Sequence, residues 1–159
     1  MPRGLDLLVP SLRERVEATF GQVAQDPTTF YARLFPKEMT LERAFVRAGG
    51  MLVSGTDPSG YGAVIPGYAN ARQVELLVEA GFTPLEAIKI STLNGAQYLG
   101  RDRTIGSIAV GKQADLVVVR GDPSANIFDV RNVETVFKKG VGYNPARLID
   151  SVRGRVGIW

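Results

Sequence analysis

Apolar residues recur every three or four positions through most of residues 1–100, which is the spacing of amphipathic helices. The predicted helices span residues 12–25, 28–35, 41–48, 70–80, 84–93 and 94–99. Capping boxes at Ser11–Glu14 and Thr83–Glu86 are expected to start two of them. Pro36 is expected to end the helix before it, because proline has no N–H to donate, and Thr40 is expected to cap the next one.

From Arg101 onwards the pattern changes to alternating and continuous apolar runs, which are typical of strands. Strands are predicted over residues 114–119, 133–137 and 141–143, the last two joined by a turn at Lys139-Gly140. Asn144-Pro145 is expected to cap a helix over 146–152. The chain therefore divides into a helical part, 1–100, a β part, 101–143, and a C-terminal helix and tail, 144–159.

The short apolar run Met51–Val53 lies between predicted helices and leads into Gly55-Thr56-Asp57-Pro58-Ser59-Gly60. This pattern predicts a parallel strand over 51–57 that is buried on both faces. Asp57 then falls at the carboxyl end of the strand, where α/β proteins place ligands and catalytic groups, and it can act as a general base or a metal ligand. The same residues also form a good turn, because Asp and Ser side chains bond their own backbone. Local pattern alone leaves both interpretations open.

Composition narrows the choice of chemistry. The 159 residues include no Cys and no His, which excludes disulfides, thiolate metal sites and a Ser-His-Asp triad. The net charge of +3 comes from interspersed charges rather than a basic cluster, so no nucleic-acid partner is expected. No run approaches the roughly 18 apolar residues of a membrane span, and no signal peptide is evident, so a cytoplasmic protein without membrane contact is expected.

Three stretches resemble the amidohydrolase superfamily. Residues 76–87 (LLVEAGFTPLEA) and 91–96 (STLNGA) look like the final helix pair of its barrel. Residues 106–119 (GSIAVGKQADLVVV) are similar to the strand pair that follows the barrel. The likeness runs in order from about Ala48 to Lys139 and is nearest to the imidazolonepropionase-like and prolidase-like members.

The resemblance implies an α/β fold: the last βα units of a (β/α)₈ TIM-type barrel, followed by part of a small C-terminal β-sandwich. It implies that one or two divalent ions, often zinc, activate water against a cyclic amide, amidine or peptide-like small molecule. Asp57 matches the Asp that ends the eighth strand, contacts a metal and takes the proton of the attacking water. Ser59 and Tyr61, in the loop that follows, are weaker candidates for substrate contacts. Lys112 and Asp115 match structural positions.

The sequence departs from the family pattern because the family's His-X-His pair, mid-barrel ligand and two further histidines are missing. Catalytic zinc normally takes three protein ligands, so the chain alone is expected to hold no metal tightly and to have little or no hydrolase activity. The chain is therefore expected to be the C-terminal portion of such an enzyme. The alternative is a non-catalytic module that pairs with a partner, another copy or a barrel-complementing chain through strand edges and apolar faces.

Overall fold

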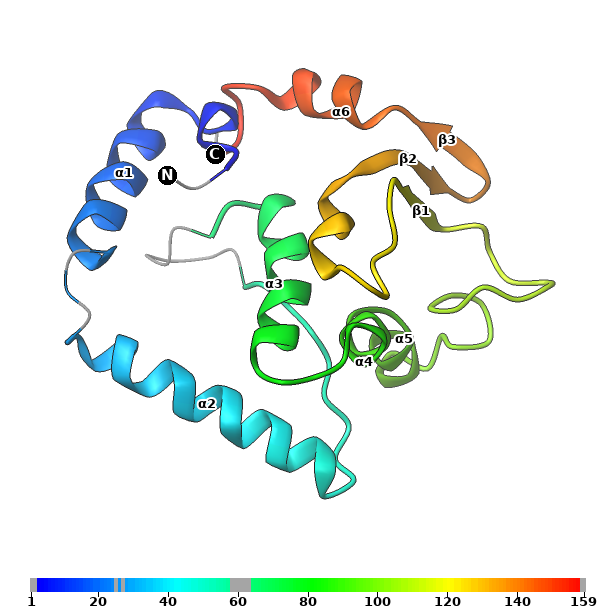
Figure 1. The fold of residues 1–159 in the computed structure, drawn as a ribbon. Coiled ribbons are helices and arrows are strands. Elements are labelled where there is room, and N and C mark those ends of the chain that lie inside the picture. The colour runs from blue at the N-terminus through cyan, green and yellow to red at the C-terminus, as the bar shows by residue number, and fades with distance from the viewer. Residues whose placement is uncertain (1–2, 25, 27, 58–63, 158–159) are drawn as a thin grey trace.

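A computed structural model describes residues 3–24, 26, 28–57 and 64–157 as a set of helices with a small sheet on one side (Figure 1). The helices are η1 (Leu5–Leu7), α1 (Pro10–Ala24), α2 (Phe30–Arg47), α3 (Tyr68–Glu79), α4 (Pro84–Lys89), η2 (Ile90–Asn94), α5 (Gly95–Tyr98), η3 (Ile127–Arg131) and α6 (Pro145–Val152). The strands are β1 (Leu116–Val119), β2 (Val133–Lys138) and β3 (Val141–Tyr143). Helix α3 lies in the middle, with α1 and α2 on one side and the sheet and α6 on the other (Figure 1).

The main helical core lies between α3 and α4. Leu77, Phe82, Ala87 and Ile90 are buried together, and Leu52 and Val46 pack against them. The predicted capping box is confirmed: the Thr83 side chain accepts from the Glu86 N–H, and Glu86 accepts from the Thr83 N–H. This cap fixes the start of α4, which continues through the π-helical η2 into α5.

Two predicted helix boundaries are wrong. Helix α1 begins at Pro10, so Ser11 lies inside the first turn rather than before it. Helix α2 runs without interruption through Pro36, and Thr40 lies inside it, donating from Oγ1 to the Pro36 carbonyl at 2.9 Å. A single proline removes one backbone hydrogen bond, and the eleven residues that follow it in α2 maintain the helix. None of the helices in the described part of the chain could cross a membrane.

The first and last segments of the chain pack together. The Val9 N–H donates to the Val156 carbonyl at 3.0 Å, and the Val156 N–H donates to the Leu7 carbonyl at 2.9 Å. Nearby, Arg153 forms an ion pair with Asp6. Leu5 and Leu8 are buried in a second core with Ile65. These contacts place the two ends of the chain side by side (Figure 1).

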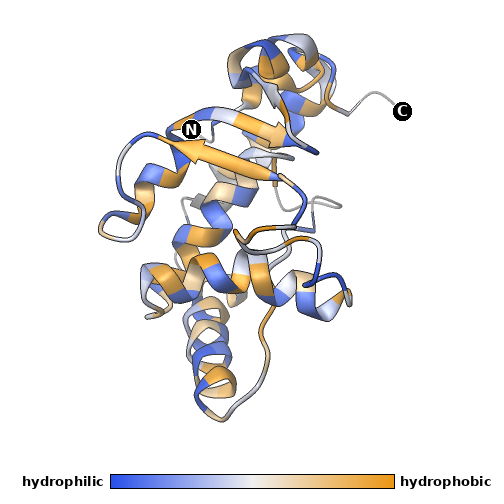
Figure 2. Cartoon of the chain, turned by 90° about the vertical axis from the view of Figure 1, so that its right-hand side faces the viewer, coloured by the Kyte–Doolittle hydropathy of each residue, from blue (hydrophilic) through white to orange (hydrophobic). Residues whose placement is uncertain are grey.

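The three predicted strands form one antiparallel sheet in the order β1-β2-β3. Figure 2 shows that these strands are largely hydrophobic, whereas the helices mix hydrophobic and hydrophilic residues. Asp115 anchors the β2–β3 turn: its carboxylate accepts from Lys138 Nζ at 2.6 Å and from the Lys139 N–H at 2.8 Å. Lys139 has a φ of 51°, and the bond to its N–H helps to hold that left-handed conformation.

One buried ion-pair network joins the sheet region to α3. The Glu75 side chain is only 1% exposed, and Arg131 of η3 binds it through Nε and Nη2. Arg72 adds a bond from Nη1 at 3.3 Å and also pairs with Glu79. Burial would raise the pKa of Glu75, but the bonds from Arg131 and Arg72 outweigh it, so the pKa is lowered. The charged form of Glu75 is therefore the one that holds η3 against α3.

Glu75→Gln is expected to destabilise the chain by about 3 kcal/mol, because it leaves Arg131 without its buried counter-charge. Glu79→Gln is the matched control on the same helix, and since Glu79 is 46% exposed it should cost less than about 1 kcal/mol. Urea unfolding followed by circular dichroism measures both. Equal losses for the two variants would contradict the assigned role of Glu75.

Asp115→Asn should reduce stability in a pH-dependent way. The bonds from Lys138, then Lys139 and Gln113, lower the pKa of Asp115 to about 2. Because the folded pKa lies below the unfolded value of about 3.9, the stabilisation is complete above that value and is lost as the pH falls towards 2. Urea midpoints of the natural chain and the variant should therefore differ most near pH 6 and converge near pH 2. A gap that does not change with pH would contradict this.

Candidate functional site

The candidate site is centred on Asp57, which follows the segment 51–57. That segment is held to the helical core at one well-defined point: Asn94 in η2 donates from Nδ2 to the Leu52 carbonyl at 2.8 Å. The Leu52 side chain packs on the α3–α4 core. A local excursion to i→i+5 bonding such as η2 is frequent at functional sites. Here it carries the side chain that fixes the segment leading to Asp57.

The start of the segment is also positioned by close packing. A Cβ at Gly50 would lie 2.4 Å from the Phe45 ring, so the backbone at Gly50 passes directly beneath that ring. Gly49, with a φ of 93°, ends the preceding helix in the left-handed conformation. The chain therefore leaves α2 in a fixed direction towards Asp57.

The predicted strand over 51–57 does not form. No strand pairing is found in this segment, and the expected burial on both faces is wrong because Met51 and Val53 are 53% and 38% exposed. A parallel strand needs neighbours that supply ladder bonds, and in the described part of the chain the sheet consists of β1, β2 and β3 only. The segment 51–57 therefore has the apolar sequence of a buried strand but no neighbouring strand to pair with among the described residues.

Asp57 is exposed, and its φ of 37° is unusual for a residue other than glycine. Such a conformation is common at functional sites and also in turns, so it is compatible with both interpretations of this residue. Ser59 and Tyr61, the other two candidates, lie outside the described residues.

The residues around Asp57 do not fit a complete metal site. Over the described ranges, no group of three or more His, Cys, Asp or Glu side chains comes together. The sequence also contains no histidine, the commonest nitrogen ligand of zinc. The described part of the chain therefore does not bring together the three protein ligands that a catalytic zinc normally takes.

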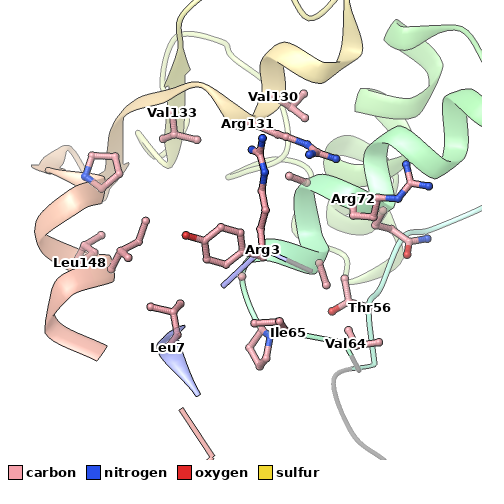
Figure 3. A pocket seen from close by; sticks show the side chains of 18 of the residues that line it. Arg3, Leu7, Thr56, Val64, Ile65, Arg72, Val130, Arg131, Val133 and Leu148 are labelled. Atoms are coloured by element: carbon pink, nitrogen blue, oxygen red, sulfur yellow. The ribbon is translucent and has the colours of Figure 1, made fainter. Parts of the chain in front are cut away.

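A large cavity lies beside Thr56, the residue that precedes Asp57. Its volume is about 1020 Å³, and Thr56 lines it together with Val64 and Ile65 (Figure 3). The rest of the wall comes from the N-terminal segment, α1, residues 66–67, α3, η3, β2 and α6. The candidate catalytic carboxylate is thus adjacent in sequence to the wall of a space that can hold a small molecule.

Sequence reasoning did not find the residues that organise this region. Glu75 lies within an amphipathic pattern as an ordinary polar position, and its partner Arg131 is 56 residues away. Asn94 bonds to Leu52, 42 residues away. Pairings across such sequence distances leave no local signal. Lys112, in contrast, bonds within its own loop: it donates from Nζ to Ser107 Oγ at 2.6 Å and to the Ile105 carbonyl at 3.4 Å, which ties the loop before β1 together.

The amino-acid sequence of this chain is similar to those of known proteins. The amidohydrolase family profile matches residues 35–142. Adenine deaminase 3 of Rhizobium meliloti is 41% identical over 63 residues, covering 40% of this chain and 11% of that protein. Imidazolonepropionase of Fusobacterium nucleatum is 29% identical over 106 residues, covering 62% of this chain and 24% of that protein.

Solved structures of other proteins resemble this chain in fold. A Xaa-Pro dipeptidase with bound methionine superimposes with a TM-score of 0.63 at 24% identity, covering 86% of this chain and 34% of that one. Molinate hydrolase gives a TM-score of 0.62 at 26% identity, covering 81% and 30%. The chain thus spans about a third or less of the length of these relatives. The region matched by the family profile, residues 35–142, includes Asp57, Glu75, Asn94 and Arg131. The chain belongs to the amidohydrolase family.

Proposed function

We propose that this chain is the C-terminal portion of an amidohydrolase that hydrolyses a C–N bond of a small amide-type or amidine-type molecule. The observation that carries the proposal is the family match over residues 35–142, which includes Asp57. The substrates named for the relatives, adenine and imidazolonepropionate, are the candidates to test first. Both fit the class of cyclic amides and amidines.

In this proposal Asp57 takes the proton from the attacking water. A carboxylate suits that task because it is anionic at neutral pH and can accept a proton directly from water. The Asn94 bond to the Leu52 carbonyl positions the segment that carries it. Substrate contacts by Ser59 and Tyr61 are also part of the proposal.

The family generally binds a divalent metal, and zinc is the ion proposed for the complete enzyme. Asp57 would be its ligand from this chain, and the remaining ligands would have to come from elsewhere. The chain by itself is therefore proposed to be inactive. In the complete enzyme its residues 101–143 are proposed to form part of the β-sandwich.

A second candidate is a non-catalytic module that completes a barrel or binds another protein. One observation favours it: α2 has no buried residue, and Phe30, Tyr31 and Leu41 on this helix are 63%, 77% and 69% exposed. An apolar surface of this kind usually meets a partner. The two candidate functions differ in whether the Asp57 carboxylate is needed for activity.

A fusion protein tests the proposed chemistry. The part of Fusobacterium nucleatum imidazolonepropionase that aligns with this chain is replaced by the matching residues of this chain, and imidazolonepropionate hydrolysis is measured. We expect activity in the fusion, a loss of at least about 100-fold in kcat for Asp57→Asn, and none in the unfused chain. Asp102→Asn is the control and should leave kcat within about twofold.

The proposal is contradicted if the fusion and its Asp57→Asn variant turn over at the same rate. Hydrolysis by the unfused chain that is lost in Asp57→Asn would contradict the inactivity of the chain alone. Full activity of the variant would leave the non-catalytic module as the better account.

A further inference from the structure

The cavity beside Thr56 has a chemical character that the proposed hydrolysis does not use. Its wall is mainly aliphatic and aromatic, with Leu7, Ile65, Leu76, Val133 and Leu148 among the contributors. Side chains from the N-terminal segment, α3 and α6 converge on it (Figure 3). A concave apolar space of this size is the usual form of a small-molecule site.

The charges that line the cavity all have one sign. The described residues of its wall include Arg3, Arg72 and Arg131 and no Asp or Glu. Arg72 and Arg131 already have counter-charges, because they pair with Glu75 and Glu79. Arg3 has no carboxylate within ion-pair distance among the described residues, and its side chain extends into the cavity in the direction of Arg131 (Figure 3). Arg3 is an exposed residue, so one positive charge without a carboxylate partner stands at the wall of a mainly apolar space and is accessible from solvent.

The position of Arg3 is set by its neighbours. A Cβ at Gly4 would lie 2.5 Å from Cδ2 of Tyr68, so the backbone lies directly against that ring. The φ of 85° at Gly4 is one that other residues rarely adopt. The next residue, Leu5, is buried. Arg3 thus directly precedes two residues that are packed against the rest of the protein.

We propose that this cavity binds a small molecule with an apolar body and a single anionic group, which Arg3 receives. The apolar body would contact the aliphatic wall, and a carboxylate or sulfonate would pair with the guanidinium. A neutral molecule of the same shape would gain only the apolar contacts. This binding is independent of hydrolysis at Asp57.

Two fluorescent probes with the same ring system separate these contributions. The anion is 1-anilinonaphthalene-8-sulfonate, and its uncharged counterpart is N-phenyl-1-naphthylamine; each is titrated into the full chain at low salt. We expect the sulfonate to bind more tightly than the amine. Arg3→Gln should weaken the sulfonate about fivefold and leave the amine unchanged, a size set by a partly exposed ion pair.

Two further variants control for binding elsewhere. Arg103→Gln removes an exposed arginine outside the cavity wall and should affect neither probe. Ala71→Trp fills the cavity from α3 and should weaken both probes, with circular dichroism confirming that the helices remain. The proposal is overturned if Arg3→Gln and Arg103→Gln weaken the sulfonate equally, or if folded Ala71→Trp binds both probes as before. Loss of fusion-enzyme activity in Asp57→Asn with unchanged probe binding would separate this site from the proposed chemistry.

Discussion

The buried carboxylate of Glu75 is the constraint on which the arrangement of this chain depends. A charge that is 1% exposed is tolerated only when it is paired and fully hydrogen-bonded, and Arg131 and Arg72 supply those bonds. Arg131 ends η3, which leads directly into β2, so the pair sets where the sheet lies relative to α3. Glu75 and Glu79 together give counter-charges to Arg131 and Arg72, two of the three arginines that line the cavity. The Glu75 network therefore contributes both to the packing of the sheet region and to the charge of the adjacent space.

The elements whose signals are local were predictable from the sequence. The capping box at Thr83, the turn at Lys139-Gly140 and the Asn144 cap each depend on residues within three or four positions, and all three are found. The errors arise where distant contacts decide. Pro36 indicates a helix end by its own chemistry, but the residues on both sides continue α2 through it. Met51–Val53 has the composition of a buried strand, yet a strand also needs neighbours, and a local pattern cannot supply them.

Only part of the candidate site could be predicted from the sequence. The sequence pointed to Asp57 through its place after an apolar run and through the family resemblance, and the comparisons confirm the family. The Asn94 bond to Leu52 and the Arg131 pair with Glu75 were out of reach, because they join residues 42 and 56 positions apart. The first bond ties η2 to the segment 51–57, and the second ties η3 to α3. The catalytic role of Asp57 is a proposal that the fold accommodates: Asp57 is an exposed residue, it follows Thr56 of the cavity wall, and its segment is tied to the core.

The most direct test of the central claim is where a metal lies relative to Asp57. Crystals of the imidazolonepropionase fusion grown with zinc would locate the ion by its anomalous scattering. The account predicts a zinc peak at roughly 2 Å from an Asp57 carboxylate oxygen, the distance of a coordinating carboxylate. A well-occupied zinc site with the Asp57 carboxylate more than about 6 Å away, too far to coordinate it, would contradict the assignment of Asp57.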